Sequence, residues 1–169
     1  MSIVTENKRD ASKLVSNLNV YLIKNEPPDF ITWFMLGGKN FMPLKPTSSI
    51  DFVIAGSKGI PKLSVHNLAV LLDVPMKDMA SLLNISYKTL GRKKDTDILS
   101  SIASSLTIEI ANTITKGLYI FEDAAKLNRW LHKENKALKG NKPFDLLNTP
   151  TGIKLVNQIL GRIEEGVYT

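Results

Sequence analysis

The sequence predicts an all-α fold: a helix-turn-helix domain, then a long central helix, then a small helical C-terminal domain. Apolar residues recur every three to four positions along most of residues 50–163, which is the period of helices buried on one face. One segment, residues 98–121, is apolar on too many faces for a free surface helix. The sequence shows no sustained alternation of apolar and polar residues, the pattern that marks a β-strand.

Length and composition fit one compact domain, or two small domains that share a core. The chain has 169 residues, of which 43% are hydrophobic and 22% are charged, an ordinary globular composition. It contains no cysteine, so disulfides, thiolate metal sites and a cysteine nucleophile are excluded. A reducing compartment is compatible with this, and we expect a cytoplasmic protein.

The charge balance is basic, with a net charge of +6 and a pI near 9.5, which favours partners that carry phosphate groups. The first ten residues hold several charges and no apolar run, so no secretory leader is expected. No stretch approaches the roughly 18 apolar residues needed to cross a bilayer. A membrane partner is therefore not expected.

Residues 1–47 are expected to form an irregular N-terminal arm, because they contain four of the eight prolines and two adjacent glycines. A short apolar piece between these helix breakers is expected to dock through Trp33 and Phe34. After the arm, we expect a helix-turn-helix domain over residues 48–97. The long helix and a C-terminal domain are expected to occupy residues 98–169.

Three helical patterns follow the arm. Ile50, Val53 and Ile54 have the spacing of one helical face, which predicts the first helix. Ser64 can cap the second helix through its hydroxyl. Pro75 suits the first turn of the third helix, where its missing N–H costs nothing.

The third helix and the residues after it have the pattern of a helix-turn-helix. Such a motif needs a small residue where its helices cross, and Ala80 is that residue. It also needs a turn residue that tolerates positive φ; Asn84 fits, because asparagine adopts the left-handed region more readily than most residues. Ser86 can then cap the second helix, and Leu90 can anchor it.

The second helix of this pair would read DNA. Its first residues would face base edges in the major groove, and the basic cluster at its far end would meet phosphates. The candidate DNA-binding residues are Ser86, Tyr87, Lys88, Thr89, Arg92, Lys93 and Lys94.

An alternative is that this helix pair is structural and contacts no DNA. Gly91 inside the second helix costs roughly 1 kcal/mol relative to alanine. Lys93 falls where such motifs usually bury an aliphatic residue. The basic cluster can also be a solvated helix end that complements the helix dipole.

The long helix is expected to be either central or dimer-forming. An apolar residue recurs at every fourth position of it, which gives a continuous buried stripe. These residues are Ile102, Leu106, Ile110, Ile114 and Leu118. A helix over residues 122–133, a loop over 138–152 and a last helix over 153–163 are expected to follow.

Two stretches carry the motifs of a known protein family. The first is the run from Thr89 to Lys93 at the end of the helix-turn-helix. The second and more specific stretch lies in the C-terminal domain and comprises Trp130, Leu131, Ala137, Leu138, Gly140, Pro143, Leu146, Leu147, Thr149, Gly152, Val156, Leu160, Gly161, Arg162, Ile163, Gly166, Val167 and Tyr168. Together they resemble the Xre-type antitoxins (Xre, MbcA and ParS-like) of the bacterial type II RES–Xre toxin–antitoxin systems. The chain departs from the family pattern at Lys139, where a glycine is usual, and at Glu134, where a proline often precedes the asparagine.

The resemblance, which covers about residues 50–169, implies an antitoxin that neutralises a cognate RES-domain toxin. Such a toxin degrades NAD, and the antitoxin's C-terminal domain covers its active-site cleft. The resemblance also implies a homodimer, and repression of the operon by the toxin–antitoxin complex bound to operator DNA. The toxin-binding residues to which it points are Trp130, Lys142, Pro143, Phe144, Arg162, Glu164, Glu165, Tyr168 and Thr169.

The residues by themselves leave two of these assignments open. Trp130 can be an interface anchor, since buried aromatic residues dominate binding hot spots, or a core residue at helical spacing with Leu127 and Leu131. The tail after Ile163 is short and of mixed charge, so it can thread into a cleft or merely fray.

Catalytic chemistry has little support in the sequence. His66 and His132, the only histidines, lack zinc-ligand spacing, and no phosphate-binding loop is present. We therefore expect no enzyme activity, no metal and no cofactor. Two alternatives to an antitoxin and autorepressor remain: a protein-binding inhibitor without DNA binding, and a stand-alone helix-turn-helix transcriptional regulator.

Overall fold

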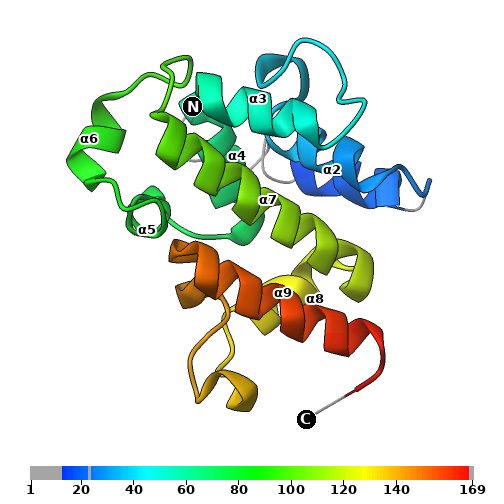
Figure 1. Ribbon diagram of the computed structural model, residues 1–169. Helices are drawn as coiled ribbons and strands as arrows, with labels where there is room; N and C mark the ends of the chain where they lie inside the picture. The colour runs from blue at the N-terminus through cyan, green and yellow to red at the C-terminus, as the bar shows by residue number, and fades with distance from the viewer. Residues whose placement is uncertain (1–12, 23, 168–169) are drawn as a thin grey trace, which may run out of the picture.

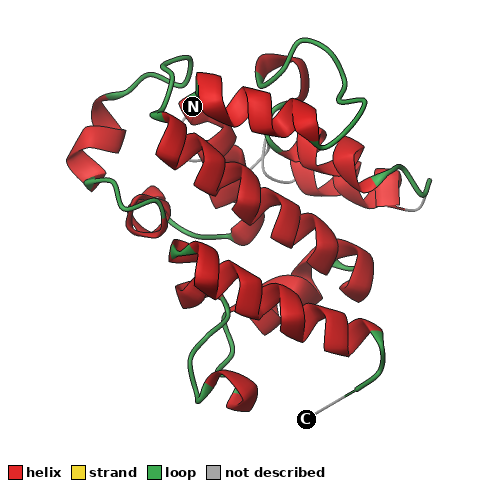
Figure 2. Cartoon of the chain, in the orientation of Figure 1, coloured by secondary structure: helices red, strands yellow, loops and turns green. Residues whose placement is uncertain are grey.

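The computed structural model of the chain describes residues 13–22 and 24–167. This part of the chain contains helices and loops but no strand, and its single β-bridge joins Pro61 and Ile98. Figure 2 shows this all-helical architecture, and the predicted fold class is confirmed. None of the described helices is both long and apolar enough to span a membrane.

A helical stretch at residues 13–22 precedes the numbered elements. These are α2 (Pro28–Met35), η1 (Gly38–Asn40), α3 (Ile50–Lys58), α4 (Lys62–Leu72), α5 (Met76–Leu82), α6 (Tyr87–Arg92), α7 (Ser101–Phe121), α8 (Ala124–Leu131), η2 (Lys136–Leu138), η3 (Phe144–Asn148) and α9 (Pro150–Glu164).

Helix α7 runs through the middle of the molecule, as Figure 1 shows. Helices α2, α3 and α4 pack against it from the N-terminal half of the chain, and α8 and α9 from the C-terminal half. The four-residue apolar repeat explains this position, because Ile110, Ile114 and Leu118 are at most 1% exposed. The prediction of a long central helix is confirmed. Ile102, the first residue of the repeat, differs from the others and is 81% exposed.

The N-terminal part is more regular than the irregular arm that we expected. Residues 13–22 are helical because Leu14, Leu18 and Leu22 recur every four positions and form an apolar face. Leu18 on that face is fully buried. Pro28 begins α2 instead of breaking a helix, since a first-turn residue has no intrahelical N–H bond to lose.

Helix α2 docks firmly on the core. The Trp33 side chain is 6% exposed, and its indole N–H donates a hydrogen bond to the carbonyl oxygen of Met42 at 2.9 Å. On the neighbouring position, the hydroxyls of Thr32 and Thr115 form a buried hydrogen bond of 2.8 Å between α2 and α7. These contacts tie the N-terminal segment to the central helix.

Helix α3 forms where the apolar spacing predicts it, but the apolar residues that define this spacing face solvent. The three residues concerned are 58%, 64% and 46% exposed: Ile50, Val53 and Ile54. The buried side of α3 is formed by Phe52 and Gly56 instead. Gly56 allows a close approach to α7, because a Cβ there would lie 3.0 Å from the Ser105 hydroxyl oxygen.

The C-terminal helices use similar close contacts with α7. Gly117 lets α8 approach, since a Cβ on it would overlap the Leu127 side chain. The Asn157 amide on α9 donates a hydrogen bond to the Thr113 hydroxyl at 2.9 Å. The short helix η3 then packs between α9 and α5, so the C-terminal part of the chain also contacts the first helix of the helix-turn-helix pair.

Candidate DNA-binding and partner-binding sites

The turn between α5 and α6 has the geometry that the sequence indicates. Asn84 has a φ of 54°, in the left-handed region. The Ile85 N–H donates to the Ala80 carbonyl oxygen at 2.9 Å and closes the turn. Ala80 and Leu90 are each 1% exposed, which lets the two helices cross closely and anchors α6.

Helix α6 begins with a capped first turn. The Ser86 hydroxyl oxygen accepts a hydrogen bond from the Thr89 N–H at 3.0 Å, and the two hydroxyls bond to each other at 2.7 Å. The cap satisfies an N–H group that the helix itself leaves unpaired. The hydroxyls of Ser86 and Thr89 are already hydrogen-bonded to each other, and that of Ser86 is also bonded to the backbone. Tyr87 and Lys88, whose side chains are exposed, are therefore better placed to contact the edges of DNA bases.

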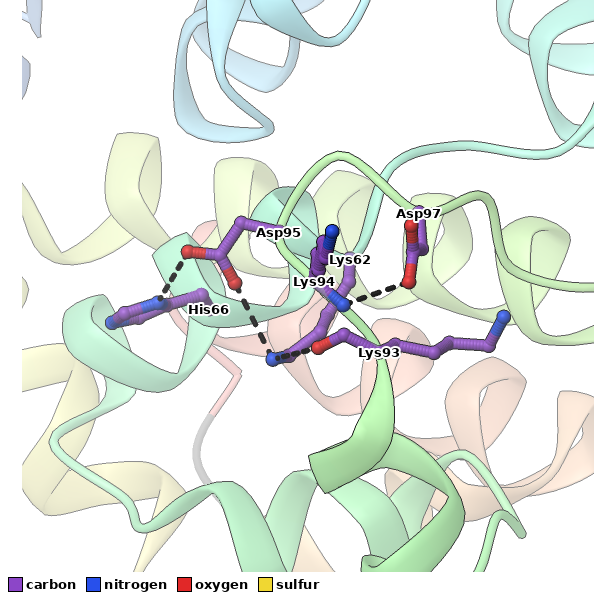
Figure 3. Close-up of polar contacts among 6 residues, drawn as sticks. All are labelled: Lys62, His66, Lys93, Lys94, Asp95 and Asp97. Atoms are coloured by element: carbon purple, nitrogen blue, oxygen red, sulfur yellow. Dashed lines mark hydrogen bonds and ion pairs between the residues drawn. The ribbon is translucent and has the colours of Figure 1, made fainter.

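Charged contacts fix the loop that leaves α6 onto α4, as Figure 3 shows. The Lys62 ammonium donates to the carbonyl oxygen of Lys93 at 2.7 Å and lies 3.4 Å from the Asp95 carboxylate. The other Asp95 oxygen is 3.7 Å from Nδ1 of His66, which completes an ion pair when the imidazole is protonated. The loop after α6 is therefore held by side chains of a different helix.

The loop also ties down one of the predicted DNA-binding cations. The Lys93 ammonium donates to the Ile98 carbonyl oxygen at 3.0 Å, and the Lys93 side chain is half-buried. The neighbouring Lys94 uses its backbone N–H to bond the Asp97 carboxylate at 2.8 Å and leaves its side chain exposed. Exposed cations on this side of the chain are therefore Lys88, Arg92 and Lys94.

An apolar pocket lies where the C-terminal ends of α7, α8 and α9 meet. Its volume is about 240 Å³. For comparison, a cavity of roughly 150 Å³ can hold a benzene ring. Its lining residues are Phe121, Trp130, Asn135, Ala137, Ile159, Arg162, Ile163 and Val167. The pocket can thus accept one large apolar side chain.

Trp130 forms the aromatic wall of this pocket. Its ring centroid is 5.6 Å from that of Phe121, and the Trp130 side chain is half-buried against the core. One part of Trp130 therefore packs on the core and the other faces the pocket, while its role as an interface anchor stays a prediction. Arg162 lines the same pocket from α9 and is exposed.

Among the other predicted toxin-binding residues, those that the structure describes do not line the Trp130 pocket. Phe144 is 7% exposed and its ring lies 4.7 Å from that of His132, and Pro143 is also buried. Lys142 is exposed and lines a second hollow beside α5, together with Asp78. Glu164 and Glu165 are exposed at the end of α9. Tyr168 and Thr169 lie outside the described residues.

A tight turn positions the polar edge of the pocket. The Asn135 N–H donates to the Asn141 carbonyl oxygen at 3.1 Å, and the Asn135 side chain accepts from the Ala137 N–H at 2.9 Å. Lys139 in this turn has a φ of 54°. A left-handed residue explains why glycine is usual at this position, since glycine adopts positive φ without a steric penalty.

The start of α8 is fixed by Asp123. Its carboxylate accepts a hydrogen bond from the Lys126 N–H at 2.8 Å. This backbone hydrogen bond lowers the pKa of Asp123 below the usual 3.8, against a smaller opposing effect of desolvation. The cap holds the first turn of the helix that carries Trp130.

Several pocket residues were not singled out from the sequence. From the sequence, Phe121 is expected at the end of the long helix, and Ile159 and Ile163 fall in the expected last helix over 153–163. Their spacing of four on α9 was visible, but it does not tell a buried core from the wall of an open pocket. The signal that could have found them is the aromatic residue at the end of each neighbouring helix.

Fold and site together define a class: a small all-helical protein that joins a helix-turn-helix-like pair to a helical layer with an open aromatic pocket. Residues 116–166 match the family described as the antitoxin Xre/MbcA/ParS C-terminal toxin-binding domain. The "Prs ADP-ribosylating antitoxin" of Sphingobium sp. (strain YBL2) is 25% identical to this chain over 138 residues, which cover 76% of this chain and 87% of that protein. Residues 116–166 are therefore similar to an Xre/MbcA/ParS-type toxin-binding domain, and they include most of the residues that line the Trp130 pocket. The similarity to an antitoxin over most of the chain supports the same family.

Proposed function

We propose that this antitoxin neutralises a cognate RES-type toxin by binding it through the Trp130 pocket and the end of α9. The observation that supports this is the position of the pocket: seven of its eight lining residues, all except Val167, lie within residues 116–166. An apolar centre with an aromatic wall and a polar edge is the composition of binding hot spots. Asn135 and Arg162 provide that edge.

Binding at this pocket would bring the toxin against the C-terminal end of the chain. Val167 lines the pocket, and the exposed carboxylates of Glu164 and Glu165 precede it. Cationic groups that hold the diphosphate of NAD also bind carboxylates. We therefore propose that this end of the chain covers the toxin's NAD-binding cleft, and that the antitoxin itself catalyses nothing.

The class of toxin is a further part of the proposal. The name of the Sphingobium relative connects that protein with ADP-ribosylation, a reaction in which NAD is the donor. For this chain, we propose a partner that consumes NAD. Whether water or a protein accepts the ADP-ribose would be measured directly on the purified toxin.

We also propose that α6 binds operator DNA in the cytoplasm, and that the active assembly is a homodimer that represses its operon together with the toxin. The left-handed Asn84 and the buried Ala80 support a helix-turn-helix, and Lys88, Arg92 and Lys94 supply exposed positive charge. Each cation that neutralises a phosphate makes binding weaker as salt increases.

A second candidate is a toxin inhibitor that does not bind DNA. Helix α6 has only six residues and contains Gly91, and the Lys93 ammonium is engaged within the chain. These features are unusual for a DNA-reading helix and favour a structural role for α6.

Two measurements test the proposals separately. For the toxin, the chain is co-expressed with the RES-type reading frame next to its gene, and NAD loss by the purified toxin is followed with and without the chain. We expect co-purification and inhibition at equimolar chain. Unchanged NAD loss with excess chain would contradict the proposal.

For DNA, gel shifts on the promoter of the operon are recorded over a range of salt, with the chain alone and with its toxin. Arg92→Ala is expected to reduce the slope of log affinity against log salt by about one. Lys39→Ala, which removes an exposed cation on η1, serves as the matched control. The absence of any salt-sensitive shift under both conditions would favour the inhibitor without DNA binding.

A further inference from the structure

Five large aliphatic side chains are exposed on α3 and at the start of α7. The exposed fractions are 58%, 64%, 46%, 52% and 81% for Ile50, Val53, Ile54, Ile98 and Ile102, which we call the α3–α7 patch. Monomeric soluble proteins rarely expose a large contiguous apolar surface, and such patches usually mark an interface.

The two parts of the patch belong to one surface. Gly56 brings α3 to within 3.0 Å of the Ser105 hydroxyl, measured from an added Cβ, and a Cβ on Gly59 would overlap the Ile98 side chain. Helices α3 and α7 therefore run side by side, as Figure 1 shows. Val53 lies one turn before Gly56 and Ile102 one turn before Ser105, so both flank the point where the helices touch.

We infer that the α3–α7 patch is the surface through which two copies of this chain form a two-fold dimer. The inference rests on the homodimer of the proposed function and assigns it a surface. Helix α7 as a whole cannot form the dimer interface, because most of its length is buried between α2, α3, α8 and α9. Its first turn is exposed and is available for such a contact.

The charge of the patch fits a second copy better than other partners. Two chains of net charge +6 repel each other. If they associate, the contact is expected at a face with few charges. The exposed residues beside the patch include Ser57, Ser101 and Ser105, with one cation, Lys58, and one carboxylate, Glu109, at its flanks. The Asp51 carboxylate is bonded to the N–H groups of Thr47 and Ser48. Lys58 and the Lys93 ammonium, which is already bonded to the Ile98 carbonyl oxygen, are few cations for a DNA-binding face.

The area is also suitable. From these exposed fractions, the five side chains offer on the order of 500 Å² of apolar surface, compared with roughly 800 Å² that a standard interface buries on each partner. Their immediate neighbours can supply the remainder. A two-fold axis presents the same patch twice, so each aliphatic row meets its copy and the assembly closes as a dimer.

This surface leaves both proposed sites open. In Figure 1, α3 lies on the opposite side of α7 from α9, which carries part of the Trp130 pocket. Ile98 lies in the loop that leaves α6, and Ile102 lies in the first turn of α7 that follows this loop. Dimerisation there would hold two α6 helices in a fixed relation while each pocket stays accessible.

The test is sedimentation velocity of the full chain at concentrations from about 1 to 100 µM. Wild type is compared with Val53→Glu and Ile102→Glu, and with Leu155→Glu as a control that changes an aliphatic on α9 that is 44% exposed. Because both patch residues are exposed in the single chain, the substitutions should not impair folding, which circular dichroism verifies. We expect a wild-type dimer whose dissociation constant rises about 100-fold or more in the patch variants only, since each glutamate would be buried without a partner.

Four results would overturn the inference: a wild-type monomer throughout, patch variants that dimerise like wild type, a control variant that dissociates equally, or larger open assemblies. Toxin binding separates this inference from the proposed function. A monomeric Ile102→Glu variant that still neutralises the toxin supports the assignment. A variant that stays dimeric but loses the toxin would make the toxin the occupant of the patch. A dimeric wild type that binds no toxin contradicts the proposed function alone.

Discussion

The side-chain amide of Asn84 donates a hydrogen bond to the carbonyl oxygen of Asn148 at 3.2 Å. The bond joins the turn between α5 and α6 to the end of η3, and η3 also packs against α5. The same asparagine therefore shapes the turn through its backbone and contacts the C-terminal segment through its side chain. The helix-turn-helix pair and the toxin-binding segment are in direct contact through this residue.

Substitution of Asn84 separates its two roles. Asn84→Ala places a Cβ in the left-handed region and removes the amide, whereas Asn84→Gly removes the amide but tolerates the positive φ. We expect the alanine variant to lose about 1 kcal/mol more of unfolding free energy than the glycine variant, measured by urea denaturation. Equal losses would mean that the turn is not strained by a side chain at this position.

Gly91 weakens α6, and alanine should repair it. A Cβ at Gly91 would meet no other group within 4 Å, and its φ is not positive. Gly91→Ala is therefore expected to raise the unfolding free energy by about 0.5–1 kcal/mol. Gly59→Ala is the opposite control, because Gly59 has a φ of +91° and a Cβ there would overlap the Ile98 side chain. In thermal denaturation, Gly91→Ala should raise the melting temperature and Gly59→Ala should lower it. A lower melting temperature for Gly91→Ala would contradict the structure of α6.

Asp123 should make the start of α8 sensitive to acid. The hydrogen bond from the Lys126 N–H holds the pKa of the Asp123 carboxyl below 3.8. This carboxyl therefore stays ionised to a lower pH in the folded chain than in the unfolded chain. Its contribution to stability is complete well above pH 3.8 and is lost as the pH falls through the lowered pKa. Asp123→Asn keeps a capping oxygen without a titratable group. Between pH 7 and pH 3, wild type should lose more unfolding free energy than this variant; identical losses would exclude the cap as the cause.

Trp130 should contribute more to partner affinity than to folding. Trp130→Ala removes the wall of the pocket, and truncation of an aromatic hot spot typically weakens binding about 30-fold or more. Phe34→Ala is the matched control, because Phe34 is a half-buried aromatic on α2, outside the toxin-binding segment. Calorimetric titration with the toxin should show weakened binding for Trp130→Ala only. A comparable loss in both variants would indicate a general effect of stability.

Local chemistry made much of this fold predictable. Asn84 and Ser86 were recognisable because few residue types tolerate positive φ or cap a helix, and both act as expected. The central position of α7 followed from its four-residue apolar repeat. Where several residues shared one strong local preference, the sequence was sufficient.

The parts that could not be predicted depend on contacts between distant segments. Pro28 was interpreted as a helix breaker, although it begins α2, whose packing depends on the Thr32–Thr115 contact 83 residues apart. The apolar spacing of α3 predicts a helix but does not tell a core face from an interface. The Lys93 ammonium bonds a backbone carbonyl that no sequence pattern specifies.

Our central proposal is that this chain inhibits an NAD-consuming toxin through its C-terminal segment. The most direct test titrates the full chain, and in parallel Trp130→Ala, into the purified toxin of the adjacent gene while NAD loss is recorded. We expect complete inhibition at equimolar wild type and a requirement for a large excess of the variant. NAD loss that continues in saturating wild type, or stops equally well with both proteins, would contradict the claim.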